Sequence, residues 1–241
     1  MAANYFLPIK VAAQPDATTC GPTCLHAMYR FFDDPIPLSQ VVSEVTSLPT
    51  GGTLAVWLGC HALRRGYSST IYTYNLRLFD PTWFPATPRA LTERLEVQRR
   101  VKNDTKLDLA SQAYVEFLSL GGSVQYEDLT PALIERHLRQ GTPFMTGLSA
   151  TYLYGCARER DDGYDDVGGD PVGHFVVVNG YDSEQGQVMV ADPLHDNPRF
   201  DTPTYRVSVG RLIGAILLGI VTYDANLLMI APSWDRGASP C

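Results

Sequence analysis

The chain places a cysteine at a junction between a loop and a helix, in the stretch Thr-Thr-Cys-Gly-Pro-Thr at residues 18 to 23. A helix N-terminus has unpaired backbone N–H groups and a partial positive charge, and both stabilise a thiolate. Pro22 suits the first helical turn because the N–H that it lacks would have no partner there. Apolar residues then recur at helical spacing, at Leu25, Met28, Tyr29 and Phe32. Cys20 is therefore a candidate nucleophile at the mouth of a cleft.

Two later motifs offer a base and a group to orient it, which a cysteine nucleophile needs. His174 begins the apolar run Gly-His-Phe-Val-Val-Val, and Asp192 follows the next predicted strand in Ala-Asp-Pro. If the hairpin between them is symmetric about Glu184, Asp192 lies opposite Val176 and on the same face as His174. Its carboxylate would then hold the imidazole ring. A β-bulge or a shift of half a residue would instead move the two side chains to opposite faces.

Gln14 lies six residues before Cys20 and carries an amide whose N–H groups could stabilise an oxyanion, together with the Cys20 backbone N–H. Each candidate also has a purely structural interpretation. Cysteine packs as a small apolar residue, histidine occurs in cores, and aspartate before proline starts turns. The four residue types together favour catalysis over those alternatives. His195 is the reserve candidate for the base if the hairpin register differs.

These motifs resemble those of the papain-like cysteine peptidases of the C39 and C39-like group, which includes bacteriocin-leader-processing domains. The resemblance rests on Gln14, on the Cys-Gly-Pro helix start, on Gly-His-Phe-Val-Val-Val with the following Gly-Tyr, and on Ala-Asp-Pro. It leaves residues 76 to 121 unmatched. It implies a papain-like fold in which Cys20 is the nucleophile, His174 the general base, Asp192 the orienting group and Gln14 the oxyanion donor.

The first functional hypothesis is a thiol hydrolase that cleaves a peptide or related amide bond through an acyl-enzyme. A transpeptidase or acyltransferase with the same residues would pass the acyl group to an amine, and the sequence does not separate the two. A non-catalytic peptide-binding module of the same fold is the alternative from another class. We expect a peptide or protein substrate, no cofactor and no metal.

Composition limits the partners and the compartment. The 241 residues carry a net charge of -7, which argues against nucleic acid or an anionic membrane as a partner. The five cysteines are odd in number and lack a framework spacing, which is typical of free thiols in a reducing compartment. The longest apolar stretch, 212 to 223, is about half of the roughly 20 residues that span a bilayer. We therefore expect a freestanding cytoplasmic protein of undetermined oligomeric state.

The apolar periodicity predicts an α+β domain. Helices are predicted over 22 to 32, 38 to 46, 53 to 65, 91 to 101, 109 to 120, 131 to 139 and 209 to 218. Strands are predicted over 5 to 11, 69 to 74, 143 to 148, 173 to 181, 187 to 191 and 226 to 230. We interpret residues 1 to 241 as a single papain-like domain with a helical insertion around 76 to 121.

Three other features are assigned lesser roles. The acidic loop at 161 to 170 lacks the spacing of a calcium site, and we expect it to border the cleft and to favour a positively charged substrate end. Cys24 and His26 do not complete a metal site with Cys20, so packing explains Cys24 better. The remaining histidines, His61 and His137, are expected to lack carboxylate partners.

Overall fold

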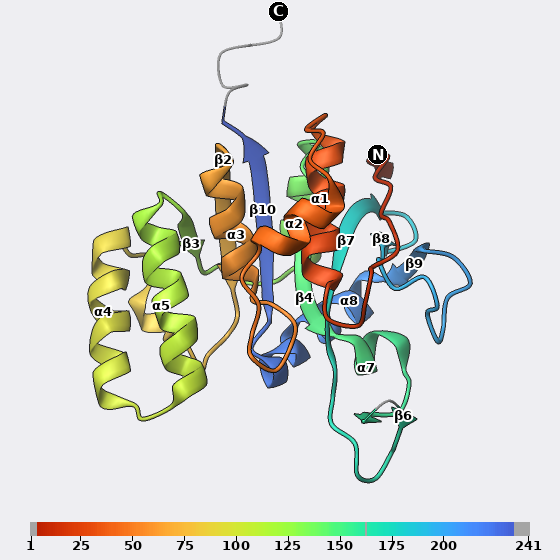
Figure 1. The fold of residues 1–241 in the computed structure, drawn as a ribbon. Coiled ribbons are helices and arrows are strands. Elements are labelled where there is room, and N and C mark those ends of the chain that lie inside the picture. The colour runs from red at the N-terminus through yellow and green to blue at the C-terminus, as the bar shows by residue number, and fades with distance from the viewer. Residues whose placement is uncertain (1–3, 162, 234–241) are drawn as a thin grey trace, which may run out of the picture.

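The computed structural model describes residues 4–161 and 163–233, which form two layers of helices around one large sheet (Figure 1). In this part of the chain the sheet has eight strands, ordered β3-β2-β10-β4-β7-β8-β9, with β1 paired to β7. All the pairs are antiparallel except β2 with β3. The strands are β1 (Asn4–Phe6), β2 (Tyr67–Thr73), β3 (Ser123–Gln125), β4 (Phe144–Ser149), β7 (Gly173–Asp182), β8 (Gln187–Ala191), β9 (Thr204–Ser208) and β10 (Asn226–Pro232).

The helices divide between the two faces of the sheet, and each face has its own apolar cluster. One face carries α1 (Cys20–Phe31), α2 (Leu38–Glu44), α3 (Ala55–Arg64), α4 (Pro88–Val101) and α5 (Thr105–Ser119). The other carries α6 (Pro131–Arg139), α7 (Ala150–Tyr154) and α8 (Val209–Leu218). Two short 3-10 helices, η1 (Pro81–Trp83) and η2 (Gly219–Thr222), lie in the connections. Within the described residues, no helix is both long enough and apolar enough to span a membrane.

The predicted α+β class is confirmed, and every predicted helix exists within a few residues of its expected ends. The first strand is shorter than expected, because only Asn4–Phe6 pair with β7. The elements that were not predicted are the 3-10 helices η1 and η2, the helix α7, and the strands β3, β5 (Glu159–Arg160), β6 (Gly163–Tyr164) and β9. Each is five residues or fewer, so its apolar pattern covers too few positions to stand out from a loop. The single-domain interpretation with an insertion stays a prediction.

A β-bulge in β7 sets the register that the site depends on. Beside the turn, Gly180 pairs with Met189, so the hairpin is centred half a residue beyond Glu184. Beyond the bulge at Asn179, Val177 pairs with Ala191. Extended by one position, this register puts Asp192 opposite Val176, as the symmetric hairpin predicted. The turn and the bulge each shift the register, and the two shifts cancel.

The bulged residue also anchors the N-terminal segment. The Asn179 side chain donates to the Leu7 carbonyl at 2.8 Å, and the Leu7 N–H donates to the Asn179 carbonyl at 2.8 Å. Residues 173 to 178 alternate between the two clusters, with Phe175 and Val177 on the α1 face and Val176 and Val178 on the other. His174 therefore shares the face of Val176, at the end of the strand.

The α4–α5 hairpin packs into the same core as α1 and α3. Phe117 of α5 is fully buried, and its ring lies so close to Gly59 of α3 that a Cβ there would be 2.7 Å from it. We expect Phe117→Ala to lower the free energy of unfolding by about 3–5 kcal/mol in one cooperative urea transition. The exposed Val101→Ala on the same hairpin should change it by less than about 0.5 kcal/mol. Two separate transitions in the wild-type protein would contradict a shared core.

Candidate active site

Cys20 is the first residue of α1 and lines a cavity of about 300 Å³ between α1, the 48–53 loop and the start of β7. The helix is held there by close contact, since a Cβ at Gly21 would lie 2.6 Å from Thr53 Cγ2 and 3.4 Å from Phe175. Glycine at this position leaves room for the Thr53 side chain, while the distance toward Phe175 of β7 is an ordinary van der Waals contact. The described lining residues are Ala17, Thr18, Cys20, Leu48, Thr50, Gly51, Gly52, Thr53, Lys106, Gly173, His174, Phe175, Thr222 and Asp224.

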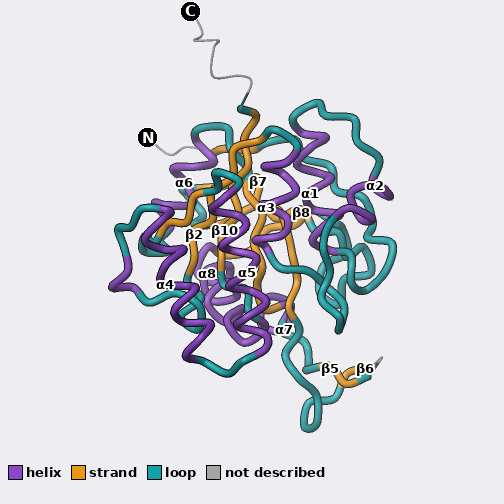
Figure 2. The backbone as a smooth tube through the Cα atoms, turned by 60° about the vertical axis from the view of Figure 1, so that its left-hand side comes forward, coloured by secondary structure: helices purple, strands orange, loops and turns teal. Residues whose placement is uncertain are grey.

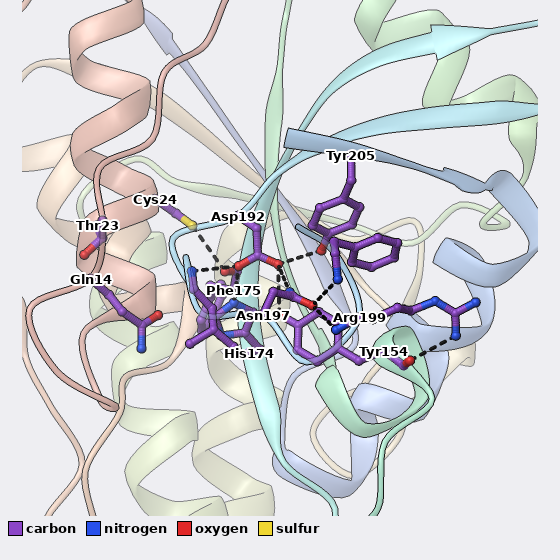
Figure 3. Close-up of polar contacts among 12 residues, drawn as sticks. Gln14, Thr23, Cys24, Tyr154, His174, Phe175, Asp192, Asn197, Arg199 and Tyr205 are labelled. Carbon is purple, nitrogen blue, oxygen red and sulfur yellow. Dashed lines mark hydrogen bonds and ion pairs between the residues drawn. The ribbon is translucent and has the colours of Figure 1, made fainter. Parts of the chain in front are cut away.

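His174 lines the same cavity and is hydrogen-bonded to Asp192 (Figure 3). Its Nε2 lies 2.8 Å from Asp192 Oδ1, so Nδ1 is the ring nitrogen left for Cys20. Burial of the ring opposes its charged form, but the charges of Asp192 and Cys20 and hydrogen bonds with both raise the pKa of His174 to about 10. The structure therefore brings the predicted thiol, imidazole and carboxylate together from α1, β7 and the end of β8.

Asp192 is fully buried and accepts hydrogen bonds on both oxygens. Oδ1 accepts from His174 and from the Leu194 N–H at 2.9 Å, so the turn expected at Asp-Pro forms as well. Oδ2 accepts from the phenols of Tyr154 at 2.8 Å and Tyr205 at 2.6 Å, and from the Asn197 amide at 3.4 Å. These donors replace the water that a buried carboxylate gives up.

The hydrogen-bond donors around Asp192 keep its carboxyl group ionised. Burial alone would raise the pKa of Asp192, but the His174 charge and the hydrogen bonds from His174, Tyr205 and Leu194 lower it below its ordinary value. Burial and the nearby carboxylate raise the pKa values of Tyr154 and Tyr205, so both phenols keep the protons that they donate. Asp192 is an anion that orients the imidazole ring.

Neither tyrosine was found by sequence reasoning. Tyr154 ends the short helix α7, and Tyr205 belongs to β9. The one available signal was the alternation of Tyr205 and Val207 with the polar residue Arg206, which is typical of a strand but covers few positions. The Tyr205 ring also stacks on Phe200, with centroids 3.7 Å apart.

Gln14 lies beside the site but does not line the cavity. Its backbone N–H donates to the Pro193 carbonyl at 3.0 Å, which ties the N-terminal loop to the Asp192 turn. Its side chain extends from that loop on the side of His174 (Figure 3). The amide nitrogen donates one hydrogen to the Asp16 carbonyl at 2.9 Å and carries a second N–H.

The remaining cysteines and histidines lie apart from this chemistry. Cys24 is fully buried and donates to the Phe175 carbonyl at 3.3 Å, which is the packing role expected for it. The four described cysteines are free thiols, and Cys241 lies outside the described residues. His195 is exposed and does not line the cavity. No group of three metal-binding side chains occurs among the residues described.

The structure corrects two expectations. His61 does have a carboxylate partner, because its Nε2 lies 3.0 Å from Glu44 while Nδ1 contacts the Tyr29 hydroxyl at 2.8 Å. It joins α1, α2 and α3. The acidic loop does not border the cleft, since none of its described residues lines the cavity. Strands β5 (Glu159–Arg160) and β6 (Gly163–Tyr164) pair with each other and project from the body of the molecule (Figure 2). Asp162 lies outside the described residues.

The His174–Asp192 pair gives a prediction on pH. We expect the His174 ring to titrate near pH 10 and, in Asp192→Asn, at lower pH, because the charge that favours the imidazolium is lost. The pKa of His174 is about 10 in the folded protein, above the ordinary value of 6.5 expected in the unfolded chain. Protonated His174 therefore stabilises the fold fully below pH 6.5, and this stabilisation is lost as the pH rises toward 10. NMR of the ring carbons and unfolding at several pH values would measure both effects. The exposed neighbour variant Asp196→Asn should leave the titration unchanged, and an unshifted ring in Asp192→Asn would contradict the coupling.

Comparisons with known proteins agree with the motifs. The family model described as the Peptidase_C39 like family matches residues 6–206. The peptidase domain of Streptococcus ComA, a bi-functional ABC transporter involved in a quorum sensing pathway, is similar in structure at 13% identity and a TM-score of 0.44, over 93% of this chain and 99% of that one. Xylellain, a cysteine protease from Xylella fastidiosa, is similar in structure at 15% identity and a TM-score of 0.43, over 94% of this chain and 85% of that one. No curated protein matches the sequence. The family match covers well over half of the chain, which therefore belongs to the Peptidase_C39 like family.

Proposed function

We propose that the protein is a cysteine peptidase that hydrolyses peptide bonds through an acyl-enzyme. One observation carries the proposal, namely that the His174 ring interacts with both Cys20 and Asp192 at the wall of one cleft. Membership in the Peptidase_C39 like family supports the reaction class. A thiol, an imidazole and a buried carboxylate in this order provide a nucleophile, a proton carrier and a group that orients the carrier.

In the acylation step, the Cys20 thiolate attacks the carbonyl carbon of the scissile bond, and the carbonyl oxygen becomes an oxyanion. His174 then gives its proton to the departing amine as the C–N bond breaks, which leaves a thioester on Cys20. Asp192 keeps the His174 ring in place and stabilises the positive charge of the ring, because hydrogen bonds fix both carboxylate oxygens of Asp192. The ring therefore transfers a proton without having to reorient.

In the deacylation step, His174 takes a proton from water, and the resulting hydroxide attacks the thioester. The acid product leaves, and Cys20 returns to a thiolate beside the imidazolium. An amine that replaced water would give a new amide, which is the transpeptidase alternative. Product analysis with and without an added amine separates hydrolysis from transfer.

A labelling experiment tests the nucleophile. We expect iodoacetamide at pH 6 to modify Cys20 roughly tenfold or more faster than the other described cysteines, because the imidazolium stabilises its thiolate. Burial raises the pKa of Cys60 to about 12 and also raises the pKa values of Cys24 and Cys156. Peptide mapping by mass spectrometry gives the rates.

The controls for this experiment are His174→Gln, which should slow labelling of Cys20, and Cys20→Ser, which should abolish peptide cleavage. Equal labelling of Cys20 and Cys156 would contradict the proposal and favour a binding module. Cleavage that survives Cys20→Ser would contradict it as well.

The oxyanion role of Gln14 is tested by kinetics. We expect Gln14→Ala to lower kcat by about a hundredfold, or on the order of 3 kcal/mol, with little change in KM, because the donor acts on charge that develops in the transition state. Gln14→Glu keeps the shape but replaces the donor with an acceptor, so its kcat should fall at least as far. A loss confined to KM would show that Gln14 binds substrate instead.

A further inference from the structure

Asp224 is a second buried carboxyl group in the cleft, and the proposed reaction does not use it. It lies between η2 and β10 and lines the same cavity as Cys20 and His174. Its residue surface is 5% exposed, and its Oδ2 accepts a hydrogen bond from the Thr222 hydroxyl at 2.9 Å. The group is thus both nearly buried and directed to the space where a substrate would lie.

The position of this carboxyl group is fixed by two glycines. A Cβ at Gly147 would lie 2.5 Å from Asp224 Oδ1, and a Cβ at Gly173 would lie 2.9 Å from Oδ2. Any larger residue at either position would displace the carboxyl group. The Asp224 N–H also donates to the Gly219 carbonyl at 2.9 Å, which fixes the backbone. Gly173 immediately precedes His174, and Asp224 and His174 both line the cavity.

The charges around Asp224 leave it without a cation of its own. Among the described residues, no ion pair within 4.0 Å includes it. The charges of Lys106 in α5 and His174 in β7 lower the pKa of Asp224, and the charge of Asp224 raises the pKa of Tyr114 in α5. Lys106 is exposed and places its Nζ 4.6 Å from the centre of the Tyr223 ring instead.

Burial is the dominant influence on this group. It raises the pKa of Asp224 to about 7, although the Thr222 hydroxyl, Lys106 and His174 act in the opposite direction. A carboxylate that has lost its water gains more from a nearby cation than an exposed one does, because the interaction is screened less. The cleft therefore holds a carboxyl group that is about half ionised near pH 7, and a positive charge on a bound ligand would favour its ionised form.

We propose that Asp224 and Thr222 form a subsite that binds a protonated nitrogen of the substrate beside the scissile bond. The nitrogen belongs either to the N-terminal α-amine of a peptide or to a lysine or arginine side chain. This inference rests on the proposed function, because it names the substrate class of the same cleft. It assigns to Asp224 the cation preference that the acidic loop at 161 to 170 was expected to supply.

Short peptide aldehydes test the subsite, because an aldehyde adds reversibly to the Cys20 thiol and protects it from iodoacetamide. One set carries lysine or its neutral analogue norleucine at each position, and a second set has a free or an acetylated N-terminus. We expect the cationic member of one pair to protect Cys20 at about tenfold lower concentration, and Asp224→Asn to abolish that difference. The pair that shows the effect identifies the source of the nitrogen.

Two further variants keep the test decisive if Asp224→Asn does not fold. Lys106→Met removes a positive charge that lines the cavity and would repel a cationic ligand, so it should increase the cation preference. Asp166→Asn on the projecting loop should not change it. A preference that persists in Asp224→Asn, or one that Asp166→Asn removes, would overturn the inference.

A reagent pair separates this inference from the proposed peptidase function. Aminoethyl and hydroxyethyl methanethiosulfonate both form a mixed disulfide with Cys20 and release methanesulfinate, and they differ in charge alone. Failure of every aldehyde to protect Cys20 would contradict the peptidase proposal. In that case a faster reaction of the aminoethyl reagent that Asp224→Asn abolishes would still support the cation subsite, and equal rates in the wild-type protein would overturn it.

Discussion

The site depends on one buried ion pair, between the His174 imidazolium and the Asp192 carboxylate. Removing two charges from water costs roughly several kcal/mol per ion, and mutual attraction offsets that cost only where the remaining hydrogen-bonding positions are filled. Here they are filled, since Asp192 accepts two phenols, an amide, a backbone N–H and the imidazole. The surrounding elements, α7, β9 and the turn after β8, supply these donors. The pair would be unfavourable in this core without them.

The His174–Asp192 pair also depends on the register between β7 and β8. His174 and Asp192 must share a face at the end of the β7–β8 hairpin, and a shift of one residue would separate them. The bulge at Asn179 provides the correct shift and also holds the N-terminal segment through Leu7. That segment continues to Gln14, which bonds to the turn after Asp192. One irregularity in a strand thus links His174, Asp192 and the loop that leads to Cys20.

The two helical layers meet at the site, and each contributes different chemistry. Cys20 comes from the α1 face, where Gly21 leaves room for the Thr53 side chain, and the phenol donors to Asp192 come from the opposite face. The floor of the cleft holds a second carboxyl group, Asp224, whose space is provided by Gly147 and Gly173. The proposed catalytic chemistry and the proposed substrate preference therefore involve separate carboxyl groups. Asp192 accepts hydrogen bonds from the protein on both oxygens, whereas Asp224 accepts one from Thr222 and lines the cleft.

The sequence by itself determined the elements and the candidate residues. Helical periodicity, the Cys-Gly-Pro start and the apolar run after His174 are local signals, because they depend on neighbours within one or two turns. Tertiary structure alone decided the bulge register, the two phenols on Asp192 and the position of Asp224. Each of these joins residues that are distant along the chain, and burial, which sets their charges, does not exist until the layers pack. A tyrosine in a five-residue strand carries no mark of the carboxylate that it will meet.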